Sequence, residues 1–131
     1  MTESAGEDSS DDNVSIDISV ANPTVKAGAK NSLVVLFSPK KGLHVVTDPP
    51  MEIELDTLQE IFRMSKLQIQ KDKKGYVASN KPVRQHFRIR SGTSPGVYLL
   101  KGEFIYYYCS EKEGWCTRAK QRIDIPITIT K

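Results

Sequence analysis

The sequence predicts an all-β protein in which two antiparallel sheets pack face to face over one core. Apolar and polar residues alternate with a period of two along most of the chain, as half-buried strands do. Glycine, proline and asparagine recur at short intervals and mark turns between short strands. Hardly any segment shows helical spacing. These observations favour an immunoglobulin-like antiparallel β-sandwich of about seven to nine strands, with at most one short helical turn.

The first half of the chain contains four expected strands separated by turn-forming residues. Val14 opens an alternating stretch, and the continuous apolar run LVVLF is typical of a central strand. Pro49 and Pro50 cannot donate to a ladder, so they are expected to separate two strands. The expected strands are 14–20, 33–37, 43–47 and 51–55, and 23–31 is interpreted as a turn-rich connection.

Residues 57–66 allow two interpretations. Thr57 and Glu60 fit a capping box, and Leu58, Ile61 and Phe62 follow at helical spacing, which indicates one short helical turn. An extended connection is an equally good interpretation.

The second half contains the longest expected strands. Residues 83–90 alternate so that Val83, Gln85, Phe87 and Ile89 share one face. Two long strands then follow, joined by the loop SEKEGW. The expected strands are 67–70, 83–90, 97–109 and 116–130.

Length and charge indicate one domain over residues 14–131, preceded by a tail. Residues 1–13 carry five acids, no base and little apolar content, so we expect a disordered acidic tail or linker there. The rest of the chain then has 19 bases against 16 − 5 = 11 acids. The first residues lack the basic start and apolar run of a signal peptide, and no segment approaches the ~20 apolar residues of a membrane span. We expect no direct membrane insertion, and either a cytosolic protein or the excised mature part of a larger chain.

The excess of bases does not by itself predict a nucleic-acid partner. The lysines and arginines are scattered through turns and strands, and no zinc-finger or single-strand platform motif accompanies them. We therefore expect no nucleic-acid binding. One alternative remains, that Arg84, Arg88 and Arg90 bind an acidic partner in a salt-dependent way.

The chain has two cysteines, Cys109 and Cys116, and strand parity predicts where they point. Cys109 shares its parity with the polar residues Lys101 and Glu103, and Cys116 shares its parity with Arg118 and other polar residues of the returning strand. Both cysteines are therefore expected on the outer face of one hairpin, near its end, unless a bulge near Pro126 changes the register.

Several roles are open for such a pair. Opposed residues in a non-hydrogen-bonded antiparallel pair lie ~4.5 Å apart at Cα, so a bridge between the strands is feasible. Three interpretations stay open: a redox-active dithiol, a structural disulfide on the surface, or two reduced thiols without a role. A metal site is disfavoured because His44 and His86 are far off in sequence and the four-ligand pattern of structural zinc is missing. We expect no metal and no cofactor.

Three stretches resemble the N-terminal domain of the thiol:disulfide interchange protein DsbD, or a related sandwich domain of a larger chain. They are VKAGAKNSLVVLFSPKKGLHVV, VRQHFRIRSGTSPGVYLLKGEFIYYYC and CSEKEGWCTRAKQRIDIPITI, and together they span roughly residues 14–130. The family is an immunoglobulin-like sandwich with a redox-active cysteine pair in a late hairpin. Thr117 and Arg118 stand where the family often has Tyr-Pro.

The resemblance implies a thiol:disulfide oxidoreductase module of the protein-disulfide reductase type. Cys109 and Cys116 would be the redox pair, with Cys116 as the attacking thiol beside Arg118. Residues that shield the pair or bind the partner would be Tyr76, Tyr107, Trp115 and Arg118. The implied partners are a thioredoxin-like protein, through a transient mixed disulfide, and a membrane electron-donor domain of the same parent chain. The implied setting is extracytoplasmic, periplasmic or equivalent, as in electron transfer for cytochrome c biogenesis. The competing hypothesis is a non-catalytic interaction or structural sandwich with a surface disulfide.

Overall fold

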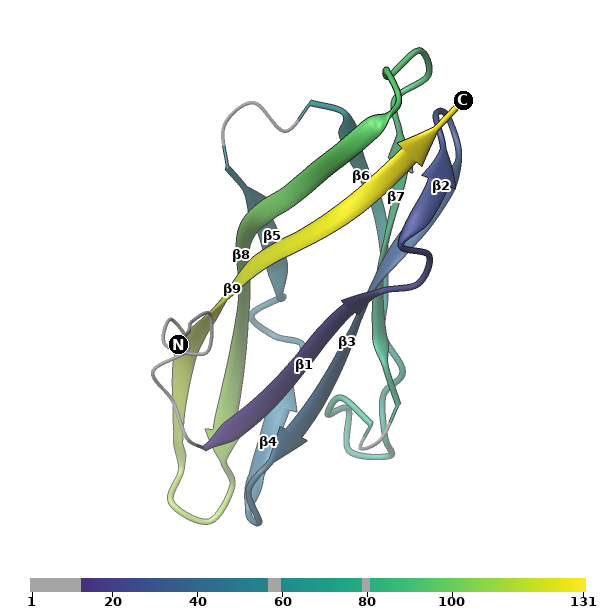
Figure 1. Cartoon of the computed structure of the whole chain (residues 1–131). Helices are drawn as coiled ribbons and strands as arrows, with labels where there is room; N and C mark the ends of the chain where they lie inside the picture. The colour runs from purple at the N-terminus through teal and green to yellow at the C-terminus, as the bar shows by residue number, and fades with distance from the viewer. Residues whose placement is uncertain (1–12, 57–59, 79–80) are drawn as a thin grey trace.

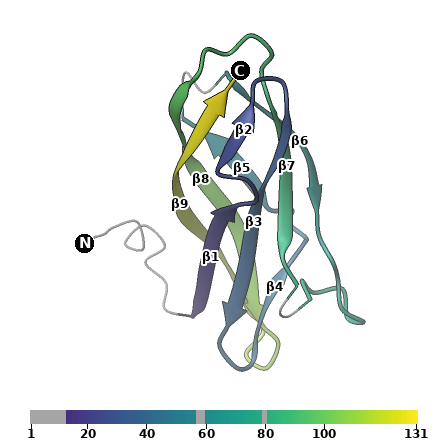
Figure 2. The ribbon, with the colours of Figure 1, turned by 45° about the vertical axis from the view of Figure 1, so that its right-hand side comes forward.

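A computed structural model of the chain describes residues 13–56, 60–78 and 81–131, and within them it confirms the predicted sandwich (Figure 1). These described ranges contain nine strands in two sheets. The rotated view in Figure 2 shows that the two sheets face each other. The strands are β1 (Val14–Val20), β2 (Thr24–Lys26), β3 (Lys30–Pro39), β4 (Leu43–Val46), β5 (Glu52–Leu55), β6 (Phe62–Gln68), β7 (Val83–Ile89), β8 (Gly96–Ser110) and β9 (Trp115–Thr130).

One sheet has the order β1-β3-β7-β6, and the other has the order β2-β9-β8-β4 with β5 also on β8. Neighbouring strands are antiparallel except β2 and β9, which run parallel. The short strand β2 lies in the stretch 23–31, which the sequence had indicated only as a connection. After β1 the chain crosses to the other sheet.

The buried side chain of Asn31 stabilises the segment in which the chain crosses from one sheet to the other. Its Oδ1 accepts a bond from the amide of Asn22, and its Nδ2 donates to the carbonyl oxygen of Asn22 at 2.9 Å. The same Oδ1 accepts from the amide of Ser32. The side chain therefore replaces the backbone partners that Asn22 loses as the chain leaves the first sheet, which explains a buried amide in an apolar core.

The core lies between the sheets and contains the apolar face of every long strand. Phe37 of β3 meets Tyr106 of β8 with ring centroids 5.1 Å apart, and Phe62 of β6 meets Phe87 of β7 edge to face. Val83, Gln85, Phe87 and Ile89 are buried as the alternation predicts.

The two strands β4 and β5 pair in succession along the same edge of β8. β4 pairs with Tyr107–Ser110 and β5 with Gly102–Ile105, and Pro49 and Pro50 lie between them. The expected break in the ladder is therefore confirmed. Gly102 lies where β5 comes closest, since a Cβ there would overlap the carbonyl oxygen of Glu54 and lie 3.0 Å from the Cα of Leu55.

The ambiguous stretch 57–66 resolves in part. Thr57 and Leu58 lie outside the described residues, and the described part is a turn at 60–61 followed by β6. β6 begins at Phe62, earlier than the strand expected at 67–70, and its register against β7 shifts between Met64 and Leu67. This irregularity interrupts the alternation of apolar and polar residues, so the sequence pattern indicated a strand only from residue 67 onward.

Residues 1–12 of the expected acidic tail also lie outside the described residues. Asn13, the last residue of that segment, donates from Nδ2 to the hydroxyl of Tyr108 at 3.2 Å. No helix in the described ranges is long and apolar enough to cross a membrane.

Candidate functional site: the hairpin disulfide

Cys109 of β8 and Cys116 of β9 form a disulfide near the end of the longest hairpin in the structure, at the lower end of the sandwich in Figure 1. The two residues are directly opposed, with Cα atoms 4.0 Å apart. Tyr108 and Ser110 on either side of Cys109 are buried in the inner face, whereas Cys109 is half-buried and Cys116 is exposed. The prediction that both cysteines share the outer face of the hairpin is confirmed.

Two features of the local sequence place the sulfur atoms there. The β8–β9 register runs without a shift along all 15 residues of β8, so Pro126 introduces no bulge. The turn is closed by the amide of Gly114, which donates to the carbonyl oxygen of Ser110 at 2.8 Å. Gly114 has φ of 75°, a left-handed conformation that glycine adopts without strain.

His44 lies in the same row as the disulfide. β4 pairs with β8 so that His44 is opposite Cys109, which gives the order His44, Cys109, Cys116 across three strands. His44 belongs to the strand expected at 43–47. It is next to Val45, which points into the core, so strand parity directs His44 outward. Its neighbour depends on the pairing of β4 with a strand some 65 residues later, which no local pattern reveals.

Tyr76 reaches this row from a separate loop, residues 71–77. Its ring stacks on His44 with centroids 4.3 Å apart and 14° between the planes. The loop is closed by a bridge between Lys71 and Val77, and its last amide, from Val77, donates to the carbonyl oxygen of Val45 in β4 at 2.9 Å. The loop therefore lies on the β4 side of the disulfide.

The sequence DKKGY explains why the 71–77 loop is ordered. The side chain of Asp72 accepts bonds from the amides of Lys74 and Tyr76, at 2.9 and 3.0 Å. Gly75 supplies the left-handed position with φ of 85°. An aspartate that bonds the amide two residues later is the usual Asx-turn, and it directs Tyr76 back towards the sheet.

Glu111, in the hairpin turn, connects the loop electrostatically to the disulfide strand. Its Oε2 accepts from the hydroxyl of Tyr76 at 2.9 Å, Lys74 Nζ lies 3.5 Å from Oε1, and His44 Nε2 lies 3.9 Å from Oε2. The Tyr76 bond, followed by the charge of Lys74, holds the pKa of Glu111 below its ordinary value. The same bond raises the pKa of Tyr76.

Two more predicted site residues form a pair on the same face, two residues further from the turn along each strand. Tyr107 is opposite Arg118 on β9 and Val46 on β4, and strand parity puts all three on the face that carries the disulfide. Tyr107 is half-buried and Arg118 is exposed. Val46 is buried although it lies on this outer face, so neighbouring side chains cover it.

Trp115 lies on the other face of the hairpin. It is opposite Ser110, and its indole meets Tyr108 edge to face with centroids 5.9 Å apart, while its Nε1 donates to Glu113. Of the four residues expected to shield the pair or bind the partner, Tyr76, Tyr107 and Arg118 are on the disulfide side of the sheet. Trp115 supports the hairpin from the core side.

An open pocket of about 330 Å³ adjoins the row. It is lined by Gly42, His44, Lys74, Glu111 and Lys112, from the β3–β4 turn, the 71–77 loop and the hairpin turn. Within the described ranges no group of three or more His, Cys, Asp or Glu side chains is arranged to hold a metal ion.

Comparison with known proteins adds no family or relative. No protein-family model matches the sequence, and no curated protein matches it. The sandwich and the disulfide therefore define the class, an immunoglobulin-like domain with a surface disulfide between adjacent strands.

Proposed function

We propose that this domain is a thiol:disulfide exchange module that passes electrons to or from a thioredoxin-like partner through a reversible Cys109–Cys116 disulfide. The observation that supports it most directly is the position of the bridge, which lies on an outer face with Cys116 exposed. Exchange proceeds by in-line attack of a thiolate on a disulfide sulfur, so one sulfur must be reachable from outside.

As a staple the bridge is near the low end of what disulfides contribute to stability. β8 and β9 are already paired along all 15 residues of β8, and the cysteines are separated by seven positions in sequence. A cross-link that closes a short loop removes little entropy from the unfolded chain, and one placed between distant segments would remove more. The cross-link thus stabilises the fold less than one between distant segments would, and it lies where a partner can reach it.

The surroundings favour Cys116 as the sulfur that reacts with the partner. Cys109 lies between His44 on β4 and Cys116 on β9, with the 71–77 loop on the β4 side. β9 is an edge strand at Cys116, because among the described residues β2 pairs only with its last part, at 128–130. A partner approaching from the β9 edge reaches Cys116 first, and the exposed guanidinium of Arg118 lies on the same face.

The proposed chemistry conserves electrons and protons. With the pair reduced, the Cys116 thiolate attacks a partner disulfide, its S–S bond breaks, and the released partner thiolate takes up a proton. The Cys109 thiolate then attacks the Cys116 sulfur of the mixed disulfide, which restores the Cys109–Cys116 bond and releases the second partner thiol. Two electrons and two protons have passed to the partner, and the reverse sequence reduces this domain.

The resemblance to the N-terminal domain of DsbD supports the same proposal, because the resembling stretches contain both cysteines and the 43–46 strand that carries His44. On this basis we propose an extracytoplasmic setting and a membrane electron-donor domain as the source of electrons. In this interpretation the 71–77 loop with Tyr76 covers the β4 side of the bridge.

A redox titration separates this function from a structural disulfide. The protein is equilibrated with glutathione buffers, and its thiols are trapped by alkylation and counted by mass. We expect a reduction potential within roughly −180 to −270 mV, where exchange proteins operate. A potential below about −300 mV would identify a structural bridge and favour the non-catalytic sandwich.

Trapping tests the assignment of the reacting sulfur. Cys109→Ser and Cys116→Ser are each reduced and mixed with a single-cysteine thioredoxin whose thiol is activated as a mixed disulfide with thionitrobenzoate. We expect rapid release of thionitrobenzoate and a covalent complex with Cys109→Ser, which retains Cys116, and a slower reaction with Cys116→Ser. Equal rates for the two variants would contradict the assignment to Cys116.

A further inference from the structure

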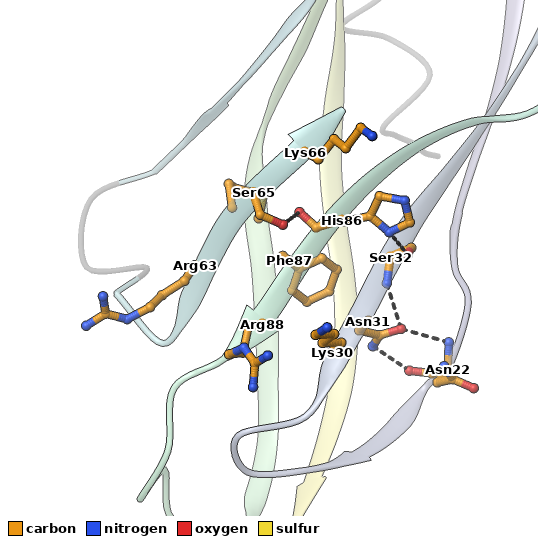
Figure 3. Close-up of a pocket in the computed structure, with 11 residues that line it drawn as sticks. Asn22, Lys30, Asn31, Ser32, Arg63, Ser65, Lys66, His86, Phe87 and Arg88 are labelled. Carbon is orange, nitrogen blue, oxygen red and sulfur yellow. Dashed lines mark hydrogen bonds between the residues drawn. The ribbon is translucent and has the colours of Figure 1, made fainter. Parts of the chain in front are cut away.

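The outer face of the other sheet carries an open cleft of about 730 Å³ over β3, β6 and β7, shown in Figure 3. Four of its lining residues are cationic, namely Lys30, Arg63, Lys66 and Arg88, and the described lining residues include no aspartate or glutamate. The cations come from three strands that are distant in sequence, so the scattered bases of the chain gather only in the folded sheet.

The strand register places three of these cations in one row. Lys30 of β3 is opposite Arg88 of β7, and Arg88 is opposite Arg63 of β6. Neighbouring strands lie ~4.8 Å apart, so the row brings like charges together without a carboxylate between them. None of the three makes an ion pair within the described parts of the chain, and each is exposed. Three cations therefore share one part of the surface, and such a patch attracts anions.

Polar side chains at the centre of the cleft are held in place. His86 lies between Ser32 and Gln68, with its Nδ1 2.8 Å from the Ser32 hydroxyl and its Nε2 2.9 Å from the Gln68 side-chain oxygen. The guanidinium of Arg88 donates to the carbonyl oxygen of Gly28 at 2.9 Å, which fixes the middle residue of the row. The cleft thus has an ordered polar floor with cations around it (Figure 3).

We propose that this cleft binds an extended acidic polypeptide segment of a partner protein. The cationic groups do not converge on one point. Figure 3 shows Arg63 and Lys66 directed away from each other along β6, with Lys30 and Arg88 on the far side of the cleft. A small anion would contact one or two of these groups, whereas several carboxylates along an extended chain match all four. β6 is an edge strand, since in the described structure it pairs only with β7, and it also offers backbone groups to such a segment.

Fluorescence anisotropy tests the proposal with the full chain. The probe is a labelled peptide of about ten alternating Glu and Ser residues, long enough to cross three strands, and its Gln/Ser counterpart is the neutral control. We expect the acidic peptide alone to bind, and to bind more weakly as salt rises from about 50 to about 500 mM. Arg63→Gln/Lys66→Gln should weaken binding about tenfold. The matched control Lys40→Gln/Lys41→Gln, with the same charge change in the β3–β4 turn, should bind as the wild type does.

Three outcomes would overturn the proposal. Equal losses in both double variants would show attraction to net charge and no site. Displacement of the peptide by equimolar inorganic phosphate would show a small-anion site. Tighter binding of a single-stranded oligonucleotide than of the peptide, sensitive to the same two residues, would replace the acidic polypeptide with nucleic acid. None of these results depends on the cysteines, so failure here leaves the proposed exchange function untouched.

Discussion

Removal of the disulfide should cost the fold about 2.5 kcal/mol and leave it intact. The perturbation is the double variant Cys109→Ala/Cys116→Ala. The cysteines are separated by seven positions, so the cross-link closes a loop of about eight residues. The chain-entropy relation gives about 8 cal/mol/K for that loop, which is about 2.5 kcal/mol at 25 °C. The strand pairs that flank the bridge and the buried inner face of the hairpin remain.

The assay is equilibrium unfolding in urea, followed by the fluorescence of Trp115, the only tryptophan in the sequence. Small domains have m values of about 1–3 kcal/mol/M in urea, so the midpoint should fall by about 1 M with no change in m. Dithiothreitol should lower the wild-type midpoint by a similar amount and have no effect on the variant, which serves as the control.

A loss of more than about 5 kcal/mol, or a variant that does not fold, would refute the reasoning, because the bridge would then hold strands that we describe as already held by their pairing. Losses of that size are typical when a native disulfide is removed from a small domain that depends on it. A lower midpoint together with a clearly larger m would show that the bridge also limits how much surface the unfolded chain exposes, an effect that the loop-entropy relation leaves out.

Three further predictions concern the surroundings of the site. Gly102→Ala should destabilise the protein by about 2 kcal/mol, since the new methyl would overlap backbone of β5, and an unchanged urea midpoint would contradict that close approach. Asp56 accepts a bidentate bond from Arg122, and this bond lowers the pKa of Asp56. The stability that the pair adds to the fold is therefore fully present above about pH 4, and it is lost as the pH falls through the lowered pKa. Asp56→Asn should therefore reduce the loss of urea midpoint between about pH 7 and about pH 3, and an unchanged acid loss would show that the pair is not formed. Glu111→Gln should lower the pKa of Tyr76 towards its ordinary value of about 10, as followed by NMR of labelled tyrosine, whereas no change would mean that the 71–77 loop does not lie against the hairpin turn.

The sequence was most informative where strands run without interruption. Strand parity alone placed Cys109 and Cys116 on one outer face, because β8 and β9 keep one register over their whole length. The same parity, applied to Trp115, assigns it to the inner face beside Tyr108. The resemblance drew attention to the tryptophan as a shield, and the register puts it on the far side of the sheet from the sulfurs.

Long-range pairing and local irregularity account for what the sequence did not reveal. β2 has three residues with only Val25 buried, so it carries no periodic signal, and its partner β9 is about 100 residues away. The position of His44 beside Cys109 depends on the β4–β8 pairing, and the gathering of Lys30 and Arg63 depends on strands that meet only through β7. In each case the sequence showed which residue types are present, but not which of them lie side by side in the folded chain.

The two proposed sites use the two outer faces of one sandwich. The cleft is on the β1-β3-β7-β6 sheet and the disulfide is on the β2-β9-β8-β4 sheet, with the core between them. A segment bound in the cleft therefore leaves Cys116 open to a second molecule or to another part of the same partner. If one partner engages both faces, its acidic segment acts as a tether that raises the effective concentration of its thiols at the bridge. Arg63→Gln/Lys66→Gln should then slow disulfide exchange with that partner at low concentration while leaving exchange with a small dithiol unchanged. Equal rates with the partner would show that the two faces work independently.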